Sequence, residues 1–541
     1  MLEQTIWEAL DDPGGPGDLR AWEGGGFREQ RWAACSSEAR RRAAGLRALG
    51  VERGTVVGCV LTNTFDVGAS LVGVWFAGGT VASLPVPSRG SQLAAYGALL
   101  ASLCEQGGCQ LLLVEERFRD AIEDVCPAVR VVSYESLASD AELAPDPPGP
   151  DQIAFIQFSS GSTGTPRGCA LTTRAIESQM KMIAAHLDVD AASDRVVSWL
   201  PLSHDMGLFG CFLVSWALGV ELTLGSPERF LVSPKTWMQD CVDRRATITA
   251  GPGFGLALAL RAARRSLPSG HVPLRAWILG SDRIDWDTLT SAIGAFDELG
   301  IGESAFMPAY GLAEATLAVT MTPLGAPIKL FEADRGALFR GDLERPESST
   351  SAATLVGCGK PLPGVEVRIA GDSPVGEICV RSPCGATAYV GDPEKTAETF
   401  VGGELRTGDL GAMVDGELYV IGRDDDMLSI GGRNVHAGEI EALIGRETGA
   451  KSGSCALVDL IDGGQTRLVA MIEPEEGFDE LSRLARRIER VVANAAAARI
   501  DECVFVPRRT LPKTPSGKIQ RFRCRELLTS DETEPIARVH S

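Results

Sequence analysis

The stretch FSSGSTGTPRG, residues 158–168, decides how the rest of the chain is interpreted. It holds three glycines, five Ser or Thr hydroxyls and one arginine, and it follows the apolar run IAFIQF, 153–158, which is typical of a buried strand. Glycine lets backbone N–H groups approach phosphate oxygens closely, and hydroxyl groups add further donors. The segment therefore predicts a phosphate-binding loop at the end of a strand, rather than a flexible Ser/Gly linker.

Positive charge in this loop comes from Arg167. A Walker A loop needs Gly, four residues, and then Gly-Lys-Ser/Thr, but counting from Gly161 the chain has Pro166 and Arg167 where Gly and Lys should stand. P-loop NTPase chemistry is therefore not expected. The residues expected to donate to a nucleotide phosphate are Ser160, Gly161, Ser162, Thr163 and Gly164.

The loop resembles the signature of the adenylate-forming superfamily, which includes acyl-CoA synthetases, fatty acyl-AMP ligases, peptide-synthetase adenylation domains and luciferases. Those enzymes usually have Lys at the position of Arg167, and Arg keeps the charge with a different contact geometry. Four further segments follow in the family's order, and the resemblance covers roughly residues 20–530. It implies that the chain uses ATP and Mg²⁺ to activate a carboxylic acid.

Two of these segments resemble the family's nucleotide site. AYGLAEAT, 309–316, implies that Tyr310 and Gly311 lie beside the adenine and that Glu314 is a catalytic ligand of magnesium, a metal that prefers oxygen ligands. RTGDLG, 406–411, implies that Asp409 accepts hydrogen bonds from the ribose. In LGSDR, 279–283, the residues expected to border the adenine and acyl pockets are Gly280 and Ser281.

The other two segments define the domain organisation. GRDDDMLSIGGRN, 422–434, resembles the family's hinge, with Arg423 as a further ribose contact and Asp425 as the pivot. LPKTPSGKIQR, 511–521, resembles the loop of the catalytic lysine, here Lys518, which implies a contact with the reacting carboxylate and phosphate. The expected domains are a large adenylation domain, 1–422, a hinge, 423–426, and a small C-terminal domain, 427–541.

The segment WLPLSHDMGLFG, 199–210, narrows the resemblance to fatty acyl-AMP ligases and implies that His204 acts beside the acyl pocket. The interval from Glu314 to Gly359 is also longer than acyl-CoA synthetases generally have. In acyl-AMP ligases an insertion here hinders the domain movement needed for CoA transfer, and residues 327–354 fit that role. An ordinary surface loop is the alternative.

Upstream of the loop, helical and strand patterns alternate from about residue 36 to residue 130. SSEARRRAAGLRALG, 36–50, has helical spacing, whereas TVVGCVL, 55–61, and TVASLPV, 80–86, are typical of buried strands. GEICVRS and GELYVIG, after residue 375, indicate a more β-rich region. The expected fold is therefore α/β: a large N-terminal domain of α/β subdomains with a β-rich part, plus a small mobile C-terminal α+β domain.

Composition limits the remaining possibilities. The chain has 541 residues and a net charge of −20, which argues for more than one domain and against nucleic acid as a partner. No signal peptide and no membrane span are expected, and fourteen scattered cysteines without a paired CxxC pattern fit reduced, mostly buried thiols. The expected location is cytoplasmic.

The resemblance implies one reaction in two halves. A carboxylic acid reacts with ATP to give acyl-AMP and pyrophosphate, and a thiol then takes the acyl group. Fatty acyl-AMP ligases usually deliver it to the phosphopantetheine of an acyl carrier protein. An acyl-CoA or aryl-CoA ligase, which uses CoA instead, is the alternative, and a catalytically silent nucleotide-binding module is a more distant one. The sequence does not identify the acid.

Overall fold

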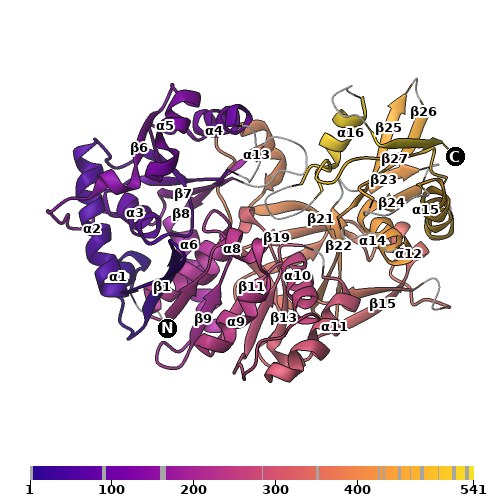
Figure 1. Ribbon diagram of the computed structural model, residues 1–541, viewed down its shortest axis with the longest axis horizontal. Helices are drawn as coiled ribbons and strands as arrows, with labels where there is room; N and C mark the ends of the chain where they lie inside the picture. The colour runs from indigo at the N-terminus through magenta and orange to yellow at the C-terminus, as the bar shows by residue number, and fades with distance from the viewer. Residues whose placement is uncertain are drawn as a thin grey trace.

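Parallel strands joined by helices build the N-terminal part of the molecule in a computed structural model (Figure 1). The structure describes residues 4–540 apart from 88–92, 159–165, 283, 349–351, 424–426, 431–432, 449–452, 463–464, 475–480, 497–498, 514–518 and 530–534. The expectation of an α/β large part with a smaller C-terminal part is confirmed. The helix predicted for 36–50 begins earlier, at Trp32, and ends at Ala48 (α2).

One sheet of the large part contains the two strands that flank the predicted phosphate loop. Its strand order is β6 (Arg130–Ser133), β5 (Leu111–Val114), β3 (Val56–Val60), β4 (Thr80–Leu84), β7 (Ile153–Phe158) and β8 (Gly168–Thr172). All neighbours are parallel except β7 and β8, which form an antiparallel pair on either side of residues 159–167. The connecting helices are α3 (Phe65–Phe76), α4 (Leu93–Gly107) and α5 (Glu116–Val125).

A second, larger sheet carries the ends of several site segments. Its order is β17 (Lys360–Pro361), β14 (Ala318–Met321), β13 (Phe306–Gly311), β12 (Ala276–Leu279), β11 (Ile248–Gly251), β9 (Arg195–Ser198), β10 (Glu221–Leu224), β1 (Asp18–Glu23) and β2 (Gly26–Arg31). The strands from β13 to β1 are mutually parallel. Ligands usually bind beyond the carboxyl ends of such strands. The ends of β11, β12 and β13 hold residues 251, 279 and 311, next to segments that the sequence assigns to the site.

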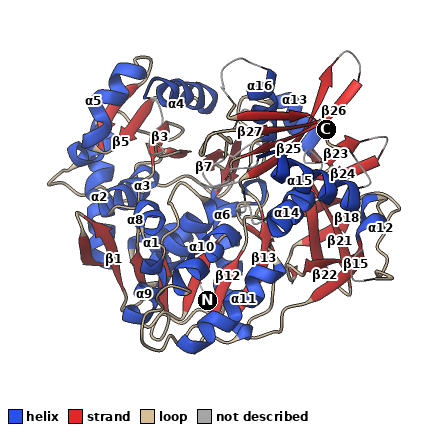
Figure 2. Cartoon of the chain, turned by 45° about the vertical axis from the view of Figure 1, so that its right-hand side comes forward, coloured by secondary structure: helices blue, strands red, loops and turns tan. Residues whose placement is uncertain are grey.

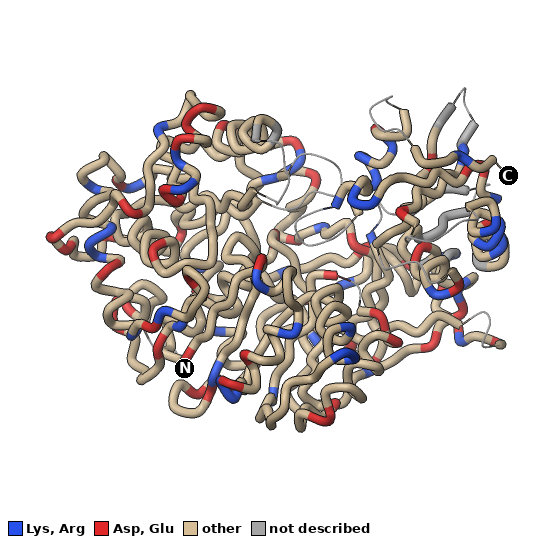
Figure 3. The backbone as a smooth tube through the Cα atoms, in the orientation of Figure 1, with Lys and Arg blue, Asp and Glu red and all other residues tan. Residues whose placement is uncertain are grey.

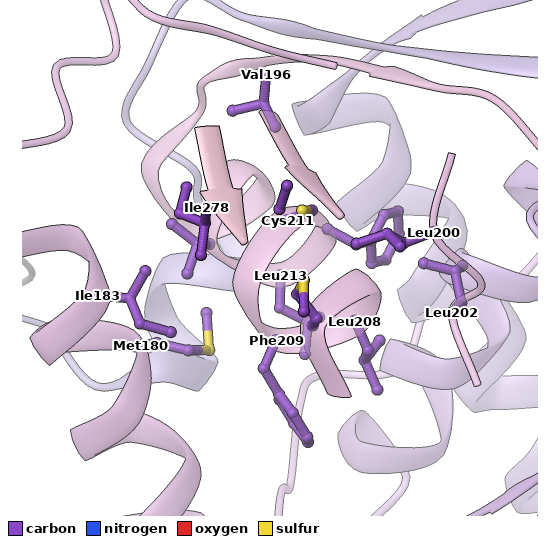
Figure 4. Close-up of a cluster of buried hydrophobic side chains, with 14 of the residues drawn as sticks. Met180, Ile183, Val196, Leu200, Leu202, Leu208, Phe209, Cys211, Leu213 and Ile278 are labelled. Carbon is purple, nitrogen blue, oxygen red and sulfur yellow. The ribbon is translucent and has the colours of Figure 1, made fainter. Parts of the chain in front are cut away.

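Helices flank this second sheet and fill its core. They are α6 (Thr173–His186), η2 (Met206–Leu213), α7 (Val214–Leu218), α8 (Pro227–Val232), α9 (Lys235–Arg244), α10 (Gly253–Ala263) and α11 (Trp286–Phe296). The sequence of η2, MGLFGCFL, is fully apolar, and every residue of η2 except Gly210 is buried. Figure 4 shows its Phe209 and Cys211 among the apolar side chains of α6, β12 and the loop after β9.

The β-rich region predicted after residue 375 is an antiparallel sheet. Its order is β18 (Glu366–Ile369), β19 (Gly376–Arg381), β21 (Glu404–Val414) and β20 (Phe400–Val401), with β22 (Glu417–Arg423) also paired to β21. β15 (Leu330–Asp334), α12 (Arg335–Phe339) and β16 (Ala352–Val356) form the segment predicted as an insertion. This segment packs Ala333, Leu338 and Leu355 against Ala412 and Tyr419 of the sheet.

The C-terminal part has its own core (Figures 1 and 2). Its sheet runs β25 (Cys455–Asp462), β26 (Gln465–Ile472), β27 (Glu502–Phe505) and β28 (Ala537–His540), with α14 (Ala437–Thr448), α15 (Leu481–Ala496) and α16 (Arg521–Thr529). A hairpin, β23 (Met427–Ile430) and β24 (Arg433–His436), precedes it. Across the described residues, the apolar clusters of this part begin at Leu428. The proposed boundaries at 422 and 427 remain predictions.

The structure also bears on the expectations for the cysteines and for membrane spans. All fourteen cysteines are free and thirteen of them are buried, as predicted for reduced thiols. Within the described ranges, no helix is both long enough and apolar enough to cross a bilayer.

Candidate active site

A cavity of about 1660 Å³ lies where the large part meets the C-terminal part. Pockets for one small ligand are typically about 300–1,000 Å³, so this space is large enough for more than one substrate. Charged side chains line one region of it and apolar side chains line another. The predicted site residues among the lining are Arg167, His204, Gly280, Ser281, Tyr310, Gly311, Glu314, Asp409 and Arg423.

Tyr310, Asp409 and Arg423 contact one another at the wall of the cavity. The Tyr310 hydroxyl donates to Asp409 Oδ2 at 2.6 Å, and Arg423 Nε donates to Asp409 Oδ1 at 2.8 Å. Burial, with the nearby Asp409 charge, raises the pKa of Tyr310 well above its usual range. The Asp409 charge likewise raises the pKa of Arg423. The phenol therefore remains a donor and the guanidinium remains charged near neutral pH.

These three residues come from the ends of separate strands. Tyr310 is in β13, Asp409 is in β21, and Arg423 is the last residue of β22. Asp409 and Arg423 are also register partners in the β21–β22 pair. Pairing between these strands thus aligns a carboxylate with a guanidinium, and the AYG and TGD segments meet although 99 residues separate the bonded side chains.

Glu314 follows β13 in a short 3₁₀ turn, η5 (Ala313–Ala315). Its Oε1 accepts a hydrogen bond from the Tyr389 hydroxyl at 2.8 Å, and its backbone carbonyl accepts from Ala386 N at 2.7 Å. Burial and the Glu314 charge raise the pKa of Tyr389 above its usual range. The phenol therefore stays protonated and orients the carboxylate beside the cavity. An oriented carboxylate at the wall of a polar cavity fits a magnesium ligand.

Arg167 lies near the end of the predicted phosphate loop, just before β8. Its Nε is 3.6 Å from Asp392 Oδ2, and its guanidinium carbon is 5.9 Å from the centre of the Tyr389 ring. Phe158 and Pro166, on either side of residues 159–165, also line the cavity. The five predicted phosphate donors, Ser160, Gly161, Ser162, Thr163 and Gly164, lie outside the described residues.

His204 and Ser281 approach each other at the junction of the polar and apolar regions. His204 Nδ1 is 2.6 Å from Asp205 Oδ1, and the His204 Nε2 is 3.5 Å from Ser281 Oγ. Ser281 has a φ of 75°, a left-handed conformation that costs energy for a residue with a side chain. The next residue, Asp282, accepts hydrogen bonds from the backbone N–H groups of Gly253 and Phe254 at the start of α10. This cap fixes the segment that carries Gly280 and Ser281.

The apolar region of the cavity extends among α6, η2 and the strands of the larger sheet. Side chains that line it and are marked in Figure 4 are Ile183, Cys211 and Ile278. Further lining comes from Leu187, Ile248 and Met321. Gly210 of η2 also faces this space, because a Cβ added there would meet only Leu317 Cδ2, at 3.1 Å. An apolar substrate tail would contact apolar side chains here instead of water, which favours its binding.

The C-terminal part closes another side of the cavity. Lys513, Ile519, Gln520 and Arg521 line it, and Lys513 and Ile519 form an isolated β-bridge. Lys518, with the rest of 514–518, lies outside the described residues, as does the predicted pivot Asp425. Their assigned roles stay predictions, although the residues that flank Lys518 border the cavity.

Tyr389 and Asp392 were missed by the sequence analysis. Both lie in TAYVGDPEKT, 387–396, which runs beside β8 through hydrogen bonds such as Val390 N to the Gly168 carbonyl, 2.8 Å. A Tyr and an Asp just before a Pro-initiated helix, α13 (Pro393–Thr399), were the available signal. That pattern is too common to indicate a site without the fold.

Comparison with known proteins defines the class. Residues 15–390 match the family model described as AMP-binding enzyme. The 4-hydroxyphenylalkanoate adenylyltransferase of Mycobacterium marinum is 30% identical over 85% of this chain and 80% of its own length. The long-chain-fatty-acid–AMP ligase FadD26 of the same species is 32% identical over 76% of each chain.

A solved structure supports the same conclusion. It comes from structural and functional studies of fatty acyl-adenylate ligases from E. coli and L. pneumophila, and it matches with a TM-score of 0.88 and 25% identity over 96% of this chain and 97% of that one. The fold and the site define an adenylate-forming enzyme. The chain belongs to the AMP-binding enzyme family and is an acid-activating ligase, as the sequence resemblance implied.

Proposed function

We propose that the chain converts a carboxylic acid and ATP to acyl-AMP and pyrophosphate, and then transfers the acyl group to the phosphopantetheine thiol of a carrier protein. The observation that carries the first half is the single cavity that combines the Tyr310–Asp409–Arg423 cluster, Glu314 and an apolar region. A nucleotide and an acid with an apolar tail can thus meet at the junction near His204.

In this proposal, acidic and basic residues of the chain bind different groups of the substrates. Asp409 accepts hydrogen bonds from the ribose hydroxyls, while Tyr310 and Arg423 hold its carboxylate in place. The phosphate loop, 160–164, and Arg167 bind the phosphates. His204 lies at the junction where the acid's carboxylate would enter. Positioning and charge neutralisation carry the catalysis, because two anions must approach each other.

Glu314 would hold the magnesium ion, and Tyr389 would orient the carboxylate that does so. When bound, magnesium neutralises phosphate charge and stabilises the leaving pyrophosphate. ATP is the co-substrate. The fit of the metal is supported by Glu314 at the cavity wall and by the hydrogen bond from Tyr389, which orients the Glu314 side chain.

Each half-reaction forms one bond and breaks one bond. A carboxylate oxygen attacks the α-phosphorus, the bond from this phosphorus to the β-phosphate oxygen breaks, and pyrophosphate leaves with the electron pair. Lys518 would neutralise the developing charge at the reacting phosphate. In the second half a thiolate sulfur attacks the acyl carbon, and AMP leaves with the electrons of the C–O bond.

The choice of a carrier protein over CoA is supported by the segment 327–354. Its helix α12 lies beside β24 of the C-terminal hairpin, and its apolar side chains pack on β21 and β22. A segment that contacts both parts favours one arrangement of them. Movement about the predicted pivot Asp425, which CoA transfer requires, would break these contacts.

The test measures both half-reactions in the wild-type protein and in Lys518→Ala. Loss of one electrostatic contact of this kind typically lowers the rate on the order of 10²–10³-fold, so acyl-AMP formation should fall by that factor while ATP binding persists. The wild-type protein should load a phosphopantetheine-bearing carrier protein faster than CoA. Unchanged adenylation by the variant would refute the lysine role, and efficient acyl-CoA formation would favour a CoA ligase.

A further inference from the structure

Acidic and basic residues are divided unequally along the chain. Residues 427–541 contain 17 Lys or Arg and 17 Asp or Glu, so the whole net charge of −20 falls on residues 1–426. A partner with negative charge is repelled by the large part and meets no net charge on the C-terminal part. Electrostatic steering of such a partner therefore favours the C-terminal part.

Within the C-terminal part, positive charge is concentrated on one face of α15. The basic residues of this helix are Arg483, Arg486, Arg487 and Arg490. They follow the spacing i, i+3, i+4, i+7, which places them on one stripe about 10 Å long. Figure 3 shows these basic positions together at the outer edge of the C-terminal part. We call Arg483, Arg486 and Arg490, whose side chains are exposed, the arginine stripe.

The opposite face of α15 accounts for the fold of the helix. Leu484, Ala485, Ile488 and Val492 are buried in the core of the C-terminal part. Folding therefore requires this apolar face but does not require arginines on the other. Like charges at i, i+3 and i, i+4 disfavour a helix, so the arginines are not explained by helix formation itself.

Solubility does not explain the stripe either. Solubility generally rises with the magnitude of the net charge, and arginines reduce the magnitude of −20 in this chain. The stripe places three positive charges on one face of a helix in a molecule whose net charge is −20. Such a cluster of charge is useful at a contact, because complementary charge sets the rate and orientation of association.

We propose that the arginine stripe of α15 is the docking surface for an acidic protein partner, the carrier protein that accepts the acyl group. The inference rests on the proposed function. The stripe extends over two helical turns, which matches the acidic side of a partner helix laid along α15. A carrier protein bound to the arginine stripe would stay on the C-terminal part. Lys513, Gln520 and Arg521 of this part border the cavity.

Two other polyanions fit the stripe less well. An anionic membrane binds an amphipathic helix through an exposed apolar face, and that face of α15 is buried. Single-stranded nucleic acid uses aromatic side chains for base stacking, and α15 has none. A long nucleic acid would also extend over the acidic large part. A compact acidic protein avoids both difficulties.

The test compares Arg483→Gln/Arg486→Gln/Arg490→Gln with a matched control, Arg261→Gln/Arg264→Gln/Arg265→Gln. The control removes three exposed arginines at the end of α10 in the large part. Gln keeps a helix propensity close to that of Arg, so both variants should fold. The probe is a stand-alone acidic acyl carrier protein that bears phosphopantetheine. Free pantetheine serves as a thiol without a protein surface.

The stripe variant should show unchanged acyl-AMP formation and unchanged transfer to free pantetheine. Its kcat/KM for the carrier protein should fall on the order of tenfold at low salt, and the difference should shrink as salt rises. Equal carrier loading by the stripe and control variants would overturn the docking surface alone. Failure of the wild-type protein to load the carrier, with efficient CoA transfer, would overturn the proposed acceptor and the dock together. Binding to phosphatidylglycerol vesicles that is lost in the stripe variant, with carrier loading intact, would assign the stripe to a lipid surface instead.

Discussion

The hydrogen bond from Tyr310 to Asp409 is the contact that joins two site segments distant in sequence. Both residues are only 8% exposed, so little water can replace the carboxylate as the partner of the phenol. A hydrogen bond to a charged group contributes about 1.5–3 kcal/mol, which is large compared with the effect of most surface contacts. Asp409 therefore depends on Tyr310, as well as on Arg423, for its orientation.

Tyr310→Phe should raise the KM for ATP by about tenfold, because about 1.4 kcal/mol of lost orientation corresponds to that factor. Pyrophosphate release at varied ATP measures it. Tyr134→Phe is the control, since it removes a buried tyrosine hydroxyl that donates to the Val60 carbonyl away from the cavity. A KM for ATP that is equally raised in both variants would show a general loss of structure instead.

A larger side chain at Gly210 tests whether the apolar region of the cavity binds the substrate tail. Gly210→Leu should lower kcat/KM for acids with long apolar tails by about tenfold or more, and affect short acids little, since the added side chain fills the apolar region. A panel of acids of increasing length tests this. Gly294→Leu is the control, because an added Cβ there meets nothing within 4 Å. Equal losses for short and long acids would contradict the acyl assignment.

Single residues also show where sequence reasoning stops. Asp409 and Arg423 were predicted because each lies in a segment with a recognisable pattern. Tyr389 was missed because its importance comes from Glu314, a hydrogen-bond partner 75 residues away that only the fold brings close. The φ of 75° at Ser281 could not be predicted from the sequence either, since serine has no preference for that conformation.

At the scale of elements, the strands were predictable because buried parallel strands are continuous apolar runs. IAFIQF, TVASLPV and the other runs that were identified correspond to β7, β4 and their neighbours. The π-helical geometry of η2 was not predicted, since MGLFGCFL is apolar on all sides and carries no periodic signal. η2 forms because the core surrounds it, which is a tertiary effect.

Shortening 327–354 should raise acyl transfer to CoA without a large change in acyl-AMP formation. The reason is the position of α12, which contacts the hairpin β23–β24 as well as the large part. Differential contact of about 1.4 kcal/mol changes the ratio of two domain arrangements tenfold. Both half-reactions should be measured in the intact and shortened proteins. A shortened protein with the same CoA rate would reduce the segment to a surface loop.

At the scale of the whole molecule, two cores with different charge meet at one cavity. The large part supplies the apolar region, Glu314 and Asp409, and the C-terminal part supplies Lys513, Ile519, Gln520 and Arg521. A direct ion pair joins the two parts, from Arg446 Nη1 of α14 to Asp287 Oδ2 of α11, at 3.0 Å. Both side chains are about half exposed or more, so this pair contributes little to holding the two parts together.

In the proposed reaction, a carboxylate oxygen attacks the α-phosphorus of ATP. The most direct measurement uses an acid labelled with oxygen-18 in its carboxylate and follows the label after the acyl group has been passed to a thiol. We expect pyrophosphate as the other product and AMP that carries one labelled oxygen. Unlabelled AMP, or ADP and phosphate in place of AMP and pyrophosphate, would contradict it.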